Sequence, residues 1–366
     1  MASENKAEIL AAHEANSALN MQALAPVARY EKDLSSDGMF SPLDERIIAA
    51  SSEALEAGET HYVDVPGIAP LRAAIAESLN GSTGAGYETG NIIVTAGVQE
   101  SRFLTIQKIG ENFESIAVPA VAHPGVQKAL GVRVRNVISL PVDANRGYLP
   151  TLEAISEVVA SGCRLFYLES PSRLSGAAYT TDEVAAIGQA LQDGGAAAIW
   201  DQGLAPWVDG DCPSLAALED SPALFTSIGE AFPGMGLASW HIGYIAAPED
   251  QIPAMQSQKQ IMAICTSTAA QYAALEASNL FEEARGLKLS QLSQLKSRLV
   301  EVAADRGLDV VTGDALNIIA LRASEAGVAE LRRAGFEIAD GALFGAPAVI
   351  RLNVNAATAD ALQALS

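Results

Sequence analysis

Residues 163–202 read CRLFYLESPSRLSGAAYTTDEVAAIGQALQDGGAAAIWDQ, and this stretch decides the fold class. Two short apolar runs, at 163–171 and 194–202, flank a segment from Asp182 to Leu191 that has the pattern of a helix. Neither run alternates polar with apolar residues, which is typical of strands buried on both faces. The stretch therefore predicts a strand–helix–strand unit of a parallel sheet covered by helices on both sides.

Similar apolar runs, separated by helical patterns, extend outward from this unit. They lie at 92–97, 115–120, 134–142, 223–227 and 242–248. Beyond Pro253 the chain is helical to about Arg306, and the last 60 residues alternate strand and helix. We expect an α/β fold with two domains. Residues 46–275 form a large domain around the mostly parallel sheet, and 1–45, a helix followed by an extended turn-rich stretch, join 276–366 in a small α+β domain.

Composition excludes several classes of partner. The 366 residues carry 23 Lys+Arg against 44 Asp+Glu, a net charge of −21, which disfavours binding to nucleic acid or to an anionic membrane. No apolar run approaches the roughly 20 residues of a membrane span, and the first residues do not resemble a secretory signal. Three widely spaced cysteines argue against a disulfide framework. We expect a cytoplasmic protein.

Candidate site residues follow from the position of ligands in open α/β sheets. Such ligands bind beyond the carboxyl ends of the strands. The residues expected there are Gly97, Val98, Gln99, His123, Ser172, Arg173, Asp201 and the run from Ser227 to Glu230.

The order of seven segments resembles the class I/II aminotransferase family, the fold-type-I enzymes that depend on pyridoxal phosphate (PLP). The segments are HYVDVPGIAPLRAAIAE (61–77), VTAGVQES (94–101), VPAVAHPGV (118–126), ESPSRLSGAAYTTDEV (169–184), IWDQG (199–203), SIGEAFPGMGLASWHIGY (227–244) and FGAPAVIRLNV (344–354). They cover nearly the whole chain. The resemblance implies a seven-stranded type of sheet, a smaller α+β domain and a homodimer with the site at its interface.

The resemblance also implies roles for individual residues. Asp201 corresponds to the carboxylate that meets the pyridine nitrogen, and Arg351 to the arginine that binds the substrate carboxylate. The remaining positions that it assigns to the cofactor are Gly97, Val98, Gln99, Ser227, His241 and Tyr62. Those that it assigns to the substrate, beside Arg351, are Arg173 and Ser35.

Several of these positions depart from the family pattern. Glu230 falls where the family carries the lysine that binds the cofactor covalently, and His241 falls on the arginine that contacts its phosphate. Arg173 replaces an asparagine, His123 the stacking aromatic residue and Leu204 a tyrosine. A carboxylate cannot form an imine, although it can carry a proton.

These departures predict a noncanonical enzyme without the lysine, in specialised biosynthesis. It would act by acid/base chemistry on a small amino-acid-like carboxylate, by cyclisation, elimination or isomerisation. Glu230 and His123 would carry protons and Asp201 would orient them. No cofactor would be covalently bound, so PLP would be absent or held non-covalently.

Three alternatives stay open at this point. The chain is a catalytically dead paralogue that binds a ligand or partner, or it is a PLP-dependent aminotransferase with an unrecognised lysine. The third alternative is a metal site of His123, Asp201, Glu230 and His241, which no local spacing supports, so we expect no metal.

Overall fold

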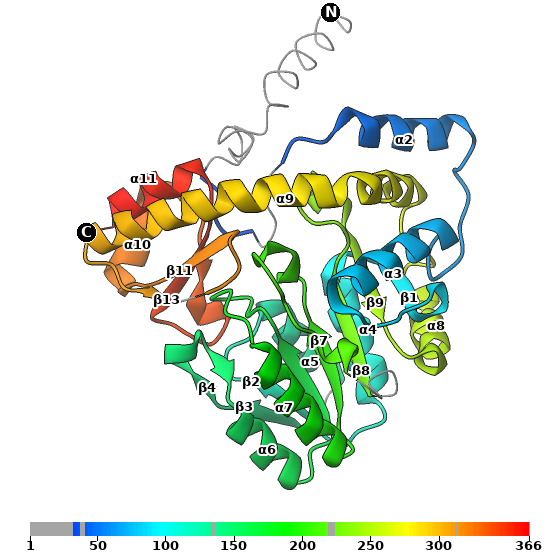
Figure 1. Cartoon of the computed structure of the whole chain (residues 1–366), viewed down its shortest axis with the longest axis horizontal. Helices are drawn as coiled ribbons and strands as arrows, with labels where there is room; N and C mark the ends of the chain where they lie inside the picture. Colours follow the sequence, from blue (N-terminus) through cyan, green and yellow to red (C-terminus); the bar gives the residue numbers. More distant parts are fainter. Residues whose placement is uncertain (1–31, 37–40, 134–135, 219–223, 312, 366) are drawn as a thin grey trace, which may run out of the picture.

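The computed structural model describes residues 32–365 apart from 37–40, 134–135, 219–223 and 312 (Figure 1). The helix expected near the N-terminus lies outside the described residues. A large sheet occupies the centre of the molecule, and a smaller sheet lies at one end of the long helix α9, Thr268–Asp305.

The large sheet has seven strands in the order β1-β9-β8-β7-β6-β2-β3. Only β9 runs antiparallel to its neighbours, so the prediction of a mostly parallel α/β sheet is confirmed. In chain order the strands are β1 Ile92–Ala96, β2 Ile116–Pro119, β3 Val137–Leu140, β6 Leu165–Glu169, β7 Ala197–Asp201, β8 Phe225–Glu230 and β9 Ile242–Ala246.

Helices cover both faces of this sheet because its strands are apolar on both sides. Alternate residues of β6, such as Tyr167 and Phe166, belong to two different core clusters. The first cluster joins the sheet to α4 (Gly97–Gly110), α5 (Pro124–Arg133) and α8 (Ile252–Met262). The opposite face packs against α3 (Ala69–Thr83), the first half of α9, α6 (Leu152–Ala160) and α7 (Thr181–Asp193). Helix α2 (Glu45–Glu56) lies along α9.

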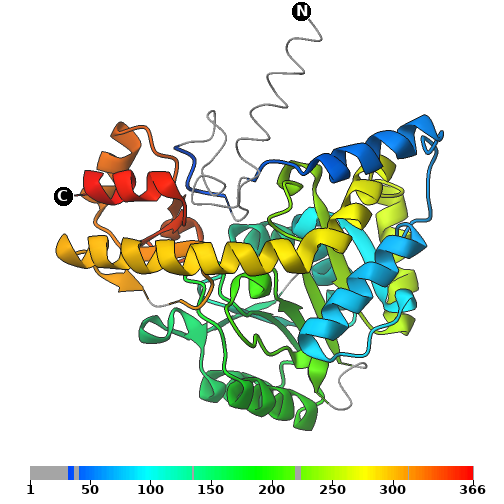
Figure 2. The same cartoon turned by 45° about the horizontal axis from the view of Figure 1, so that its top comes forward.

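The smaller sheet has four antiparallel strands in the order β10-β11-β13-β12 (Figure 2). Its elements are β10 Val310–Val311, β11 Ile318–Arg322, α10 Glu325–Arg333, β12 Ala339–Asp340, β13 Val349–Asn353 and α11 Ala356–Ala364. Leu34 and the second half of α9 share their core. The predicted domain boundaries stay predictions, and α9 runs past residue 275 without interruption. A short hairpin of β4 (Val142–Asp143) and β5 (Leu149–Pro150) lies apart from both sheets.

One strand is longer than its sequence predicts. We expected the strand after residue 223 to end at Ser227, but β8 continues through Ile228 and Gly229 to Glu230. Glycine is a poor strand former, but Gly229 is required here because a Cβ would lie 2.6 Å from the Tyr244 hydroxyl. Within the described ranges, no helix is long and apolar enough to cross a membrane. The cytoplasmic location stays a prediction.

Candidate functional site

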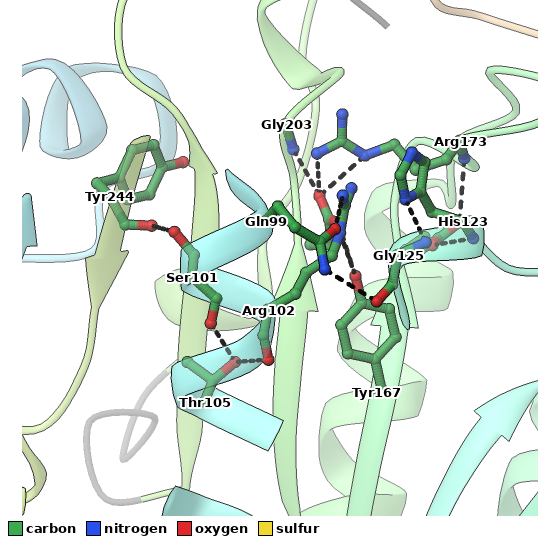
Figure 3. Close-up of polar contacts among 12 residues, drawn as sticks. Gln99, Ser101, Arg102, Thr105, His123, Gly125, Tyr167, Arg173, Gly203 and Tyr244 are labelled. Atoms are coloured by element: carbon green, nitrogen blue, oxygen red, sulfur yellow. Dashed lines mark hydrogen bonds and ion pairs between the residues drawn. The ribbon is translucent and has the colours of Figure 1, made fainter. Parts of the chain in front are cut away.

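Polar side chains gather where the central parallel strands end. Asp201 is the last residue of β7 and Glu169 the last of β6, and the strand register places them side by side. Arg173 follows β6, His123 follows β2, and α4 begins directly after β1. Figure 3 shows Arg102, Tyr167 and Arg173 converging on this point from α4, β6 and the loop after β6.

Asp201 is fully buried and is bound by two guanidinium groups. Its Oδ2 accepts bonds from Arg102 Nε and Nη2 at 3.1 and 2.9 Å and from the Tyr167 hydroxyl at 2.7 Å. Its Oδ1 accepts bonds from Arg173 Nε and Nη2 at 3.1 and 2.5 Å and from the Gly203 N–H at 3.1 Å. A carboxylate offers about four lone-pair directions, so these six donors saturate it.

The two arginines determine the charge state of Asp201. Burial alone raises the pKa of a carboxyl group, but the positive charges of Arg173 and Arg102 outweigh burial and hold the pKa of Asp201 well below its usual range. Burial, together with the Asp201 charge, raises the pKa of Tyr167 well above its usual range. Tyr167 is therefore a neutral donor to an ionised Asp201.

Glu169 connects this cluster to the two loops beside it. Its Oε1 accepts the His123 N–H at 2.9 Å and its Oε2 accepts the Arg173 N–H at 3.1 Å. Burial, and then the charge of Asp201, raise the pKa of Glu169 to about 7, whereas the His123 N–H and the two guanidiniums oppose the rise. Glu169 therefore positions the main chain of His123 and Arg173 while it titrates near neutral pH.

Helix α4 begins in a tight glycine turn. Gly97 has φ +74°, a conformation that favours glycine, and His241 packs against it. A Cβ at Gly243 would lie 2.6 Å from the Gly97 carbonyl carbon, so β9 approaches this turn backbone to backbone. The first N–H groups of a helix have no acceptor within it, and together with the helix dipole they favour a bound anion.

A buried ion pair between Lys259 and Glu100 stabilises the same turn. The Lys259 ammonium lies 2.9 and 3.1 Å from the carboxylate oxygens of Glu100, and Glu100 in turn accepts the Ala96 N–H at 2.5 Å. Lys259 also donates to Thr266. This pair ties α8 to the start of α4, so the ammonium of Lys259 serves the structure of the turn.

Arg351 joins the smaller sheet to the site. It is buried on β13, donates from Nη1 to the Arg173 carbonyl at 2.9 Å and from Nη2 to the Ser35 carbonyl at 2.5 Å. Its guanidinium lies 5.3 Å from the centre of the Phe344 ring, and the same ring packs edge-on against His123. The three residues predicted to bind substrate, Arg351, Arg173 and Ser35, therefore lie together. Arg351 contacts the main-chain carbonyls of the other two.

Other predicted residues divide into two groups. Gln99 reaches the Gly125 carbonyl beside His123, and its first-turn neighbour Val98 lies against Gly243, so both belong to the site. Ser227 does not join them. Its partner Ala246 pairs with Ile92, at the end of β1 away from Gly97, and its hydroxyl accepts from Tyr87.

Two further predicted residues differ in exposure. Tyr62 is 78 % exposed and takes no part in the site of a single chain. Glu230 is half-buried at the end of β8, beside Gly243 in the register, and its catalytic role stays a prediction.

No group of three His, Cys, Asp or Glu residues that could hold a metal ion occurs among the residues that the structure describes, so the alternative of a metal site finds no support.

Four residues of the site were missed from the sequence. Arg102 lies one helical turn after Gln99, inside a segment already singled out, and its spacing could have revealed it. Tyr167 and Glu169 lie in a strand that is otherwise apolar, where a polar residue is unusual. Gly203 gave no signal in the sequence, because its role depends on the side chain that packs against it.

Comparison with known proteins agrees with this fold. A sequence model described as "Aminotransferase class I and II" matches residues 33–365. A probable aspartate/prephenate aminotransferase from Aquifex aeolicus is 27 % identical over 83 % of this chain and 81 % of its own length. An aspartate aminotransferase from Geobacillus stearothermophilus is 24 % identical over 87 % of this chain and 85 % of its own.

A solved structure shows the same architecture. A mutant of Thermus thermophilus aspartate aminotransferase superimposes with a TM-score of 0.83 at 21 % identity, covering 91 % of this chain and 95 % of its own. The predicted aminotransferase fold, with its seven-stranded sheet and helices, is therefore confirmed.

The same comparisons overturn two expectations. The relatives are named for amino-group transfer, so the prediction of a noncanonical lysine-lacking enzyme that acts by acid/base chemistry is wrong. The prediction that no cofactor is bound covalently is wrong for the same reason. Both predictions depended on the residue at one position, Glu230, whereas the family match depends on the sequence of nearly the whole chain.

Proposed function

Because this chain belongs to the class I and II aminotransferase family, we propose that it transfers an amino group between an amino acid and a 2-oxo acid, with PLP as its cofactor. The observation that carries the proposal is the match of the family over residues 33–365. The names of the relatives quoted above support it, because each aligns over more than four fifths of its length. We take dicarboxylic amino acids as the first substrates to test, since those relatives are named for aspartate.

The cluster of cations supports a substrate that bears a carboxylate. Arg351, Arg173 and Arg102 bring three buried guanidiniums to one region, against the carboxylates of Asp201 and Glu169. Three guanidiniums against two carboxylates leave these five side chains with a net positive charge at neutral pH. A small anionic amino acid is favoured there.

The phosphate end of PLP fits the residues present. The start of α4 offers main-chain N–H groups of Val98 and Gln99, and the glycine turn at Gly97 and Gly243 permits a close approach to the backbone. His241 packs against this turn and would hold the phosphate with them.

The ring and aldehyde ends do not fit in this conformation. The carboxylate of Asp201 is saturated by its present donors, so a ring nitrogen cannot bind to it. We further propose that Glu230 stands at the family's lysine position, from its place in SIGEAF at the end of β8. Glu230 is not an amine, so the proposed function requires another lysine of this chain.

Lys288 is the first lysine to examine. Burial lowers its pKa to about 8, which raises the fraction of the neutral, nucleophilic amine. It donates to the Ser41 hydroxyl at 2.8 Å and to the carbonyl of Gly234, in the loop that follows β8. Lys296, on the same helix, has its pKa lowered by burial to about 8 and donates to main-chain carbonyls, so it is a matched control.

The test combines amino transfer with mapping of the adduct. Protein incubated with PLP is reduced with borohydride and digested, and transfer of ¹⁵N from labelled aspartate to 2-oxoglutarate is followed by NMR. We expect a pyridoxyl adduct on one lysine and measurable transfer, both lost in Lys288→Met and kept in Lys296→Met. An adduct on another lysine would exclude Lys288 as the residue that binds PLP but would leave the proposed function standing. Absence of both adduct and transfer in the unmodified protein would refute the proposed function.

We also propose that the chain forms a homodimer through the surface around Tyr62. Apolar side chains gather there, with Tyr62 78 %, Ile261 80 % and Ile264 37 % exposed. The Thr268 hydroxyl bonds the His61 carbonyl at 3.1 Å and so joins the two stretches that carry them. Sedimentation should give a dimer for the unmodified protein and a monomer for Ile261→Asp, and a monomer in both cases would contradict the proposal.

A further inference from the structure

Arg173 occupies one carboxylate oxygen of Asp201, Oδ1, and Arg102 and Tyr167 occupy the other. We infer that Arg173 is a gate: its guanidinium closes the ring-nitrogen end of the site, and a pyridine-type ligand reaches Asp201 only after that guanidinium has moved away. The inference rests on the proposed function only in taking PLP as the ligand. It explains why the phosphate end fits the cofactor and the ring end does not.

The gate is closed by direct contacts. Arg173 Nη2 and Nε lie 2.5 and 3.1 Å from Asp201 Oδ1, and both side chains are buried. The opposite oxygen, Oδ2, is held by Arg102 and Tyr167. A ring nitrogen therefore has to displace one of the two arginines.

Arg173 is the arginine that can leave. Arg102 lies on α4, and its guanidinium also contacts the Tyr167 hydroxyl at 3.3 Å and Gln99 Oε1 at 3.4 Å. Arg173 lies in the loop between β6 and α7, and its main chain is fixed at both ends, by Glu169 through its N–H and by Arg351 through its carbonyl. Rotation of the Arg173 side chain would uncover Asp201 Oδ1 while these two bonds hold the backbone in place.

Gly203 supplies the space in which the gate lies. A Cβ at Gly203 would be 1.9 Å from Arg173 Nη2 and 2.7 Å from its Cζ, closer than real atoms approach. The φ of Gly203 lies outside the left-handed region, so alanine is compatible with the backbone there. Gly203→Ala should therefore push the Arg173 guanidinium out of its place while Arg173 itself is unchanged.

Two variants thus open the gate by independent routes, Arg173→Gln and Gly203→Ala. The probe is 4′-deoxypyridoxine 5′-phosphate, which keeps the ring and phosphate of PLP but cannot react with a lysine. We expect both variants to bind it at least about tenfold more tightly than the unmodified protein, because apparent affinity falls with the fraction of molecules in the competent state. Stopped-flow association should approach a limiting rate in the unmodified protein and stay linear with ligand concentration in both variants.

Gly286→Ala is the matched control, since a Cβ there meets no atom within 4 Å, and it should bind as the unmodified protein does. Near-UV circular dichroism confirms folding of each variant. Equal affinity and kinetics in all four proteins, or no binding by any of them, would overturn the gate. The result is separate from that of the proposed function, because the probe forms no bond to an amine and transfers no amino group.

Discussion

Asp201→Asn is expected to destabilise the protein by about 3–5 kcal/mol, as found when one partner of a buried ion pair is removed. Asp201 is fully buried, and its charge compensates two guanidiniums, Arg102 and Arg173, that are themselves about 2 % exposed or less. Asparagine keeps the size of the side chain but loses the charge and turns a donor toward one of the arginines. Urea unfolding at pH 7 measures the change in the free energy of unfolding.

Tyr167→Phe is the control for this prediction. It removes one hydrogen bond to Asp201, of 2.7 Å, and leaves both ion pairs, so its cost should be about 1–2 kcal/mol. Arg173→Gln combined with Asp201→Asn should recover part of the loss, because one of the unpaired charges is then absent. A cost below 1 kcal/mol for Asp201→Asn would mean that the two arginines do not depend on this carboxylate.

Glu169→Gln is expected to flatten the dependence of stability on pH between about 5 and 8. The pKa of Glu169 is raised from 4.5 to about 7 in the folded protein, so the folded state binds its proton more tightly than the unfolded state does. Its contribution is fully present below pH 4.5 and is lost as the pH rises through 7. The loss is on the order of 3 kcal/mol, which glutamine, having no proton to lose, should not show.

Urea unfolding at pH 5 and pH 8 tests this second prediction. Glu53→Gln, at an exposed position on α2, serves as the control and should keep the slope of the unmodified protein. Asp201 does not disturb the comparison, because its lowered pKa confines its effect to acid pH, where stability falls as the carboxylate is protonated. Equal slopes in the unmodified protein and in Glu169→Gln would show that Glu169 is ionised throughout this range.

The fold could be predicted because its strands are short, apolar and separated by helices. The runs at 92–97, 163–171 and 194–202 correspond to β1, β6 and β7 within a few residues. Periodicity gave no sign that β9 is antiparallel, because antiparallel pairing depends on the path of the chain and not on the residues of the strand. The sequence pattern also placed the end of β8 too early, because a glycine such as Gly229 is typical of a turn. Its close contact with Tyr244 is visible only in the folded chain.

The site could be predicted only where position along a strand determines it. Asp201 ends a strand, His123 follows one and Gly97 begins a helix, so the general rule for α/β sheets locates them. The rule does not say which way a side chain points. Ser227 lies away from the others because of its register in β8, opposite Ala246, and the contact of Gly203 with Arg173 required the folded chain.

The error over function has a chemical origin. Under the proposal that Glu230 stands at the family's lysine position, no imine can form at that residue, but this does not exclude an imine at another lysine of the chain. Two other lysines have a pKa lowered by burial, and both lie on α9: Lys288 is buried and Lys296 is half-buried. Their pKa values depend on burial, which a motif does not report.

An NMR spectrum of the arginine Nε–Hε groups, recorded with and without 4′-deoxypyridoxine 5′-phosphate, tests directly whether Arg173 leaves Asp201 when the probe binds. The Arg173→Gln variant assigns the signal of Arg173. We expect slowly exchanging signals for Arg102 and Arg173 in the free protein, because both are bonded to Asp201, and a shift of the Arg173 signal when the probe binds. Binding of the probe with the Arg173 signal unchanged would contradict the account, because Asp201 would then not be the group that the probe reaches.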